Sequence, residues 1–221
     1  MQKEHRRVIF NQGVLVFAIG CIFGTYYEEL LTLWKNFWAS GGELIWQSRR
    51  GLVYGPFSPV YGMGAVGIYL FFYRRKMNWQ ACLFGGALLG GAFEYVLSVL
   101  QEWLFGTRSW NYSDRILDIG GRTTVPYMIF WGILVLWAAK WLFPLLEKAY
   151  RRLEGKKMNI FCTVLATFLA FDIAMSLGAS LRQAERRAGD PADNGIEEFF
   201  DKHFSDERLK KTYDNAVYVK E

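Results

Sequence analysis

Residues 51–73 read GLVYGPFSPVYGMGAVGIYLFFY and contain no charged side chain, so they are apolar enough to enter a membrane. Two prolines and the glycines beside them (Gly55, Pro56, Pro59 and Gly62) prevent an uninterrupted helix. Backbone released from a helix at membrane depth is tolerated only against protein or a water-filled cavity. The stretch therefore predicts a broken segment that enters a transmembrane helix. A tight surface turn before that helix is the alternative.

Four further apolar runs flank this segment, and together they indicate the class of the protein. A helix needs about 20 largely apolar residues to cross the roughly 30 Å hydrocarbon core. The 221-residue chain is 52% hydrophobic and 18% aromatic, and Tyr and Trp gather at the ends of the runs, as at membrane interfaces. We therefore predict an all-α, polytopic transmembrane helical bundle rather than a soluble bundle of buried helices. About five spans are expected, at 8–27, 56–73, 78–105, 123–143 and 158–179.

Basic residues mark alternate connections between the predicted spans. Eleven lie on one side, against six on the other, where they are interleaved with acidic residues. Short loops rich in Lys and Arg stay in the cytoplasm. The pattern therefore places the N-terminus in the cytoplasm and, with five full spans, the C-terminus outside. The net charge of +5 marks these loops and gives no reason to expect nucleic acid as a partner.

The composition changes after Leu181, which explains a mean hydropathy of only +0.07 for a membrane protein. We divide the chain into a transmembrane domain, residues 1–181, and a polar, partly helical tail, residues 182–221. Gly189 and Pro191 are expected to end the last long helix. A short amphipathic helix follows, which packs against the body or the membrane surface. Its apolar face consists of Ile196, Phe199, Phe200 and Phe204.

Polar residues retained within the spans are the candidates for chemistry. Glu94 lies near the middle of the 78–105 span, and it shares a helical face with Ser98 and Glu102. An ionisable group at that depth costs several kcal/mol on insertion scales and is a functional candidate by default. The alternative is a structural carboxylate that is paired with Arg or protonated.

A glycine spacing occurs twice, each time before a carboxylate. Gly20 and Gly24 precede Glu28 in the first span, and Gly86 and Gly90 precede Glu94 in the third. Small residues four apart allow helix backbones to approach closely in lipid, within one subunit or between subunits. Either parallel repeats or coincidence explains the match.

The broken segment also carries a resemblance to a known family. Arg50 to Gly64 resembles the hallmark of the putative ABC-transporter type IV permeases, a group of bacterial multi-span membrane proteins. Thr25, Asn111 and Asp118 depart from the family's pattern. Further matching positions, which with the hallmark cover about three quarters of the chain, are Gly24–Glu28, Glu94–Tyr95, Glu102–Gly106, Arg108–Ser113, Arg122, Trp131–Gly132 and Phe200–Arg208.

The resemblance implies a permease in the bacterial cytoplasmic membrane that works with a separate ATPase, since the chain has no phosphate loop of its own. We predict a permease-like subunit whose polar cavity takes a small polar or ionic solute. The mobile element would be the Gly/Pro break, and Arg50 is a natural partner for Glu28 or Glu94. The cavity candidates are Glu28, Arg50, Tyr54, Glu94, Glu102, Arg108 and Arg122.

Two alternatives from other classes stay open. One is an integral membrane enzyme with Glu94 or Glu102 as general base and Arg108 and Arg122 gripping an anionic lipid headgroup. The other is a scaffold or regulatory subunit in which every buried charge is structural. No Cys or His spacing indicates a metal site, and no cofactor is expected. The expected partners are the lipid bilayer, an ATPase subunit and other copies of the chain.

Overall fold

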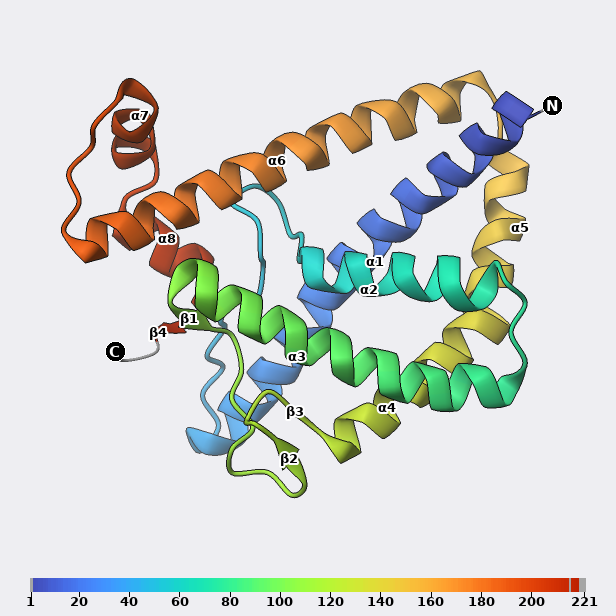
Figure 1. The fold of residues 1–221 in the computed structure, drawn as a ribbon, viewed down its shortest axis with the longest axis horizontal. Coiled ribbons are helices and arrows are strands. Elements are labelled where there is room, and N and C mark those ends of the chain that lie inside the picture. The colour runs from blue at the N-terminus through green and yellow to red at the C-terminus, as the bar shows by residue number, and fades with distance from the viewer. Residues whose placement is uncertain (1, 215, 219–221) are drawn as a thin grey trace.

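The computed structural model describes residues 2–214 and 216–218, and most of them are helical (Figure 1). Two short antiparallel pairs, β1 with β4 and β2 with β3, complete the fold. The helices are α1 (Gln2–Ala39), α2 (Pro59–Ile68), α3 (Gly86–Phe105), α4 (Val125–Trp137), α5 (Phe143–Leu153), α6 (Lys156–Ala188), α7 (Gly195–His203) and α8 (Asp206–Thr212). The strands are β1 (Thr107–Arg108), β2 (Asp118–Ile119), β3 (Thr123–Thr124) and β4 (Val217–Tyr218), and π-helical turns at Tyr69–Tyr73, Ala81–Gly85 and Ala138–Leu142 extend α2, α3 and α4.

Within the described residues, four helices are long and apolar enough to cross a membrane: Glu4–Ala39, Ala81–Phe105, Val125–Leu153 and Lys156–Ala188. The predicted transmembrane helical bundle is therefore confirmed. The second predicted span differs, because its helix covers only Pro59–Tyr73. At a rise of 1.5 Å per residue this helix is roughly 22 Å long, which is shorter than the hydrocarbon core.

Helix α2 is short because it begins inside the bundle. Ser58 has an extended backbone, and Pro59 occupies the first helical position, where its missing N–H is no loss. The Ser58 amide donates to the carbonyl oxygen of Cys21, halfway along α1, at 3.3 Å. From this point α2 runs to the end of the molecule where α3 begins (Figure 1). The Gly/Pro break thus converts a predicted span into a helix that is too short to cross the hydrocarbon core.

The loop before α2, residues 51–58, is held by the middle of α6. The Tyr54 amide donates to Asp172 Oδ1 at 3.1 Å, and the Val53 amide donates to Ser176 Oγ at 2.9 Å. Asp172 is fully buried, and so are Leu52 and Val53 of the loop. These contacts exclude the surface-turn alternative. Backbone donors freed by the break are satisfied by protein, as their position in the bundle requires.

Both glycine motifs lie at contacts between helices of the same chain. A Cβ on Gly20 would lie 2.7 Å from Ala65 Cβ of α2, and one on Gly24 would overlap the ring of Tyr61. A Cβ on Gly86 would lie 2.7 Å from Val135 Cβ of α4. The missing side chains therefore let α1 approach α2 and α3 approach α4, as small residues do in membrane bundles.

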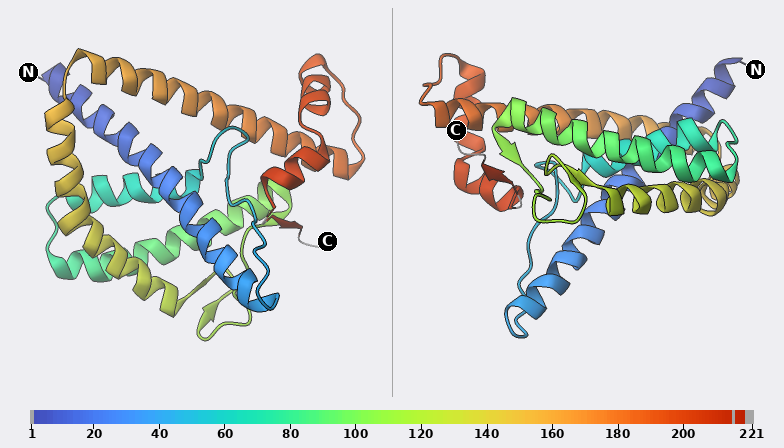
Figure 2. Two further views of the ribbon diagram at one scale, coloured as in Figure 1. Left: turned by 180° about the vertical axis from the view of Figure 1, so that it is seen from behind. Right: turned by 60° about the horizontal axis from the view of Figure 1, so that its bottom comes forward.

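The basic connections gather at one end of the bundle. The start of α1, the turn between α2 and α3, and the junction of α5 with α6 lie together there, and the two opposite views agree (Figures 1 and 2). The loop from α3 to α4 and the C-terminal tail lie at the other end. This is the segregation that the alternating charge pattern predicts.

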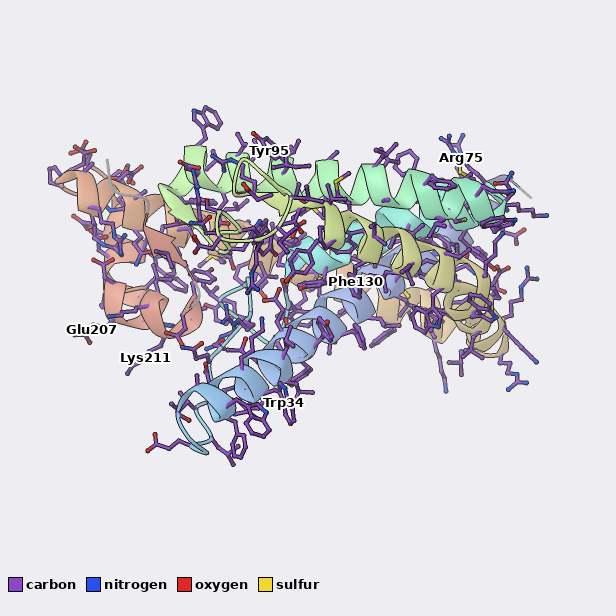
Figure 3. The ribbon with its side chains drawn as sticks, turned by 90° about the horizontal axis from the view of Figure 1, so that it is seen from below. Trp34, Arg75, Tyr95, Phe130, Glu207 and Lys211 are labelled. Carbon is purple, nitrogen blue, oxygen red and sulfur yellow. The ribbon has the colours of Figure 1, made fainter. Side chains whose placement is uncertain are left out.

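The C-terminal half of α1 projects away from the other helices (Figure 2, right). Trp34 lies on this projection (Figure 3) and is 61% exposed. Trp38, one turn further along α1, is 66% exposed. They form an edge-to-face pair with ring centroids 5.6 Å apart. Exposed indoles at a helix end suit the interface between lipid and water, where one part of the ring is apolar and the N–H is solvated.

The tail folds back onto the end of α6. Arg182 Nε of α6 pairs with Asp201 of α7 at 3.0 Å, and Arg186 pairs with Asp201 and with Asp206 of α8, each at 2.6 Å. Phe204 and Leu209 are fully buried beneath these pairs. Ile196 is 71% exposed, so only part of the predicted apolar face packs against the body.

The α3–α4 contact yields a test with a matched control. A Cβ on Gly132 would overlap the backbone oxygen of Leu83, which cannot move independently of its helix. We expect Gly132→Ala to lower the free energy of unfolding by about 1–3 kcal/mol, the usual cost of overpacking. Thermal melting in detergent measures the loss. Gly67→Ala is the control, because nothing lies within 4 Å of a Cβ there; equal melting temperatures for both variants would contradict the close contact.

Docking of the tail is expected to depend on pH. The Arg182 guanidinium lowers the pKa of the Asp201 carboxyl from its ordinary value of 3.8. The resulting stabilisation is fully present above that value and is lost as the pH falls through the lowered pKa of the docked state. Limited pepsin digestion should therefore release the tail only below about pH 4. Asp201→Asn should make the tail sensitive to pepsin at every pH tested. An unchanged digestion profile would contradict a role of the Asp201 ion pair in docking the tail.

Candidate functional site

Glu94 lies in the middle of α3, where residues of the α3–α4 loop cover it, and it is 9% exposed. The Tyr112 hydroxyl donates to its Oε1 at 3.0 Å, and the Thr123 hydroxyl donates to its Oε2 at 2.7 Å. Gly120 and Gly121 place these donors, since their positive φ angles turn the chain from β2 back to β3. Both oxygens of the carboxylate are therefore occupied by neutral hydroxyl donors.

Glu28 of α1 is a second carboxylate in this region. It accepts a hydrogen bond from the Tyr61 hydroxyl, in the first turn of α2, and its charge acts on Glu94 across the space between α1 and α3. Burial, followed by the neighbouring Glu94 carboxylate, raises the pKa of Tyr112 above its ordinary value, and Glu28 adds to the shift. We call Glu28, Glu94, Tyr61, Tyr112 and Thr123 the carboxylate pair site.

Among the described residues, no Lys or Arg forms an ion pair with Glu28 or Glu94. Two neighbouring carboxylates at this depth cannot both ionise without strong repulsion and a large desolvation cost. The two carboxylates therefore lack a compensating positive charge among the described residues, and their charge is met by neutral hydroxyl donors. The alternative of an Arg-paired structural carboxylate does not describe Glu94.

Two of the arginines predicted to line the cavity, Arg108 and Arg122, gather around Glu102. Arg108 forms a bidentate pair with it, through Nε at 2.7 Å and Nη2 at 3.0 Å, and Arg122 Nη2 approaches the same carboxylate at 2.5 Å. Arg122 also donates to Ser98 Oγ at 3.0 Å. Glu102 raises the pKa of Arg108 above its ordinary value. This triad ties the loop after α3 to the last turns of that helix.

The ion pairs of Glu102 with Arg108 and Arg122 argue against the enzyme alternative. Both guanidinium groups are already bound to the same carboxylate, with side chains 25% and 14% exposed. They are therefore not free to grip a lipid headgroup, and Glu102 is not free to act as a base. The geometry describes a structural clamp.

Arg50 and Tyr54 lie away from both clusters. The Tyr54 ring stacks on Phe171 of α6 with centroids 6.4 Å apart, and Arg50 lies beside α8 of the tail. The expected pairing of Arg50 with Glu28 or Glu94 is not formed. The reason is that Asp172 and Ser176 draw the loop toward α6 rather than toward α3.

Several residues of the site were not singled out from the sequence. Asp172 carried a signal, because it is the one charged residue in the apolar run 158–181 and has a serine four positions later. Tyr61 and Tyr112 lie inside the recognised motifs, but nothing in their spacing shows that their hydroxyls reach carboxylates on other helices. In the described part of the chain, no group of three or more His, Cys, Asp and Glu residues could hold a metal ion.

The triad predicts a stability effect at Glu102. Glu102→Gln removes the charge that neutralises two partly buried guanidinium groups, so we expect the free energy of unfolding to fall by a modest amount. This is less than for a fully buried pair, because the Glu102 side chain is 26% exposed. Thermal melting in detergent measures the change. The control is Glu43→Gln on an exposed turn; a loss as large as in Glu102→Gln would show that the triad adds nothing.

Comparison with known families agrees with the resemblance seen in the broken segment. A family model described as putative ABC-transporter type IV matches residues 15–177. This range covers α1 to most of α6, including both clusters and the broken segment. No curated protein and no solved structure is similar enough to count as a match. With most of its length matched, the chain belongs to the putative ABC-transporter type IV family.

Proposed function

We propose that the protein is the membrane-embedded, permease-like subunit of an ABC-type transporter and that its carboxylate pair site binds the solute. The family and the apolar helices support a transporter-like membrane protein. The proposal places it in the bacterial cytoplasmic membrane. The end of the bundle with the basic connections would face the cytoplasm, because short basic loops are retained there.

One observation carries the assignment of the site: the short helix α2 begins near two carboxylates that have no basic partner among the described residues. Tyr61, in its first turn, reaches Glu28, and the charge of Glu28 acts on Glu94. Discontinuous helices that end at mid-depth form the solute and ion sites of many transporters. The partial positive charge at the start of α2 also favours negative carboxylates nearby.

The chemistry of the site narrows the predicted solute class. Two carboxylates and three hydroxyl groups line the site with oxygen atoms that can accept hydrogen bonds. The carboxylates give it negative charge. An anion would meet repulsion there. The site therefore favours a cation or a protonated amine among the small polar or ionic solutes that the sequence allows.

Helix α2 is the element expected to move. It contacts α1 through Gly20, Gly24 and Gly62, where the absence of side chains leaves a smooth surface. The loop before it is held at Asp172 and Ser176, so a shift of α2 would pivot about residues 54–58. Such a shift would carry Tyr61 away from Glu28 and open the site toward one side.

A separate ATPase would have to drive the cycle, because the chain has no phosphate loop. It would dock at the end with the basic connections, where α5 joins α6. Residues 1–181 would act as the transport domain, and residues 182–221 would cap the opposite end.

The test combines co-purification with a charge-removing variant. We expect an ATPase to co-purify in mild detergent. After reconstitution into vesicles, a mixture of small cationic solutes should stimulate its ATP hydrolysis. Glu94→Gln should abolish the stimulation, because it removes one of the two acceptor charges, and the variant should still insert and elute normally. Hydrolysis and uptake of labelled solute are measured together.

The control is Glu43→Gln, which removes a carboxylate from an exposed turn and should behave as wild type. Full stimulation in Glu94→Gln would contradict the assignment of the site. If a partner co-purifies but no solute stimulates hydrolysis in either protein, the scaffold alternative replaces the transporter.

A further inference from the structure

A pocket of about 410 Å³ lies between the start of the broken segment and the tail. It is separate from the carboxylate pair site. One wall comes from the residues that lead into the loop, and the other comes from α8 and the serine before it. The lining residues are Arg50, Val53, Ser205, Glu207, Arg208, Lys211 and Thr212. Its volume lies within the usual range for small-molecule sites.

The pocket carries an excess of positive charge. Three of its residues are basic, Arg50, Arg208 and Lys211, and Glu207 is its one acidic residue. In Figure 3, Glu207 and Lys211 lie side by side at the surface of α8. The charges of the lining therefore match a ligand with about two negative charges.

Arg50 lacks an internal partner for its charge. Among the described residues it forms no hydrogen bond or ion pair, and its Nε is buried without an acceptor. A buried donor without a partner is unfavourable, and more so when it belongs to a charged group. An acceptor entering the pocket would satisfy this group, which makes Arg50 the strongest indication of a ligand.

The remaining donors are held in place around it. Arg208 donates to the His203 carbonyl oxygen at 2.6 Å, and its guanidinium lies 4.8 Å from the centroid of the Phe204 ring. The Ser205 hydroxyl accepts from the Arg208 amide at 3.4 Å, which leaves its hydrogen free to donate. Guanidinium groups bind tetrahedral oxyanions with two parallel hydrogen bonds, and an ammonium adds a point charge.

We propose that this pocket binds a phosphate group, carried either by an anionic lipid headgroup or by a free phosphate ester. The ligand would bridge Arg50 on the loop side and Arg208 and Lys211 on the tail side. Because Arg50 lies four residues before Tyr54, which is bonded to Asp172, binding would also fasten the tail to the broken segment.

The experiment uses the full chain and compares two sources of phosphate. In detergent, inorganic phosphate and glycerol 3-phosphate are titrated by calorimetry. In nanodiscs made of phosphatidylcholine with a minority of phosphatidylglycerol, the enrichment of phosphatidylglycerol around the protein is measured by mass spectrometry. Binding in the first arm identifies a free phosphate ester, and enrichment in the second alone identifies a headgroup.

Arg50→Gln and Lys211→Gln are expected to weaken the binding at least tenfold in whichever arm shows it. Lys210→Gln is the matched control, because Lys210 neighbours Lys211 on α8 but does not line the pocket. Lys211 is exposed, so its variant tests the proposal even if Arg50→Gln fails to fold. The proposal is overturned if neither source binds, or if Lys210→Gln weakens binding as much as Lys211→Gln does.

Discussion

The fold depends on two hydrogen bonds from the backbone of the broken segment to the interior of α6. Tyr54 and Val53 present amide groups inside the bundle, and Asp172 and Ser176 accept them. Buried amides without acceptors are unfavourable. With these acceptors the chain can enter the bundle without helical structure and begin a helix halfway along α1. The Gly/Pro break and the buried acid that receives it therefore together make α2 a short helix.

The start of α2 in turn positions the candidate site. Close contact with α1, permitted by Gly20 and Gly24, brings the Tyr61 hydroxyl to Glu28. The equivalent contact of α3 with α4 ends near Glu94, where Thr123 supplies a donor. In both cases the carboxylate follows the glycine contact by one helical turn. Close backbone approach therefore places a hydroxyl donor beside each carboxylate.

The charges of the protein are divided into groups with different roles. Glu102, with Arg108 and Arg122, is internally compensated and clamps a loop. The ion pairs of Arg182 and Arg186 hold the tail on α6. Among the described residues, Glu28 and Glu94 lack a basic partner, and Arg50 lacks an acidic one. Compensated charges stabilise structure, whereas uncompensated charges of opposite sign in two places are the basis of the two proposed ligand sites.

The sequence by itself determined the class and the family, because hydrocarbon thickness sets segment length and motif residues are local. It also marked Glu28, Glu94 and the Gly/Pro break. Only the tertiary structure decided which charges are paired. Arg50 was expected beside Glu94 and lies against the tail, because partners on different helices are chosen by helix packing and by where the loop finds acceptors. The second apolar run has the composition of a span, but the Gly/Pro break shortens its helix, and the loop before that helix is held by Asp172, a residue more than a hundred positions away.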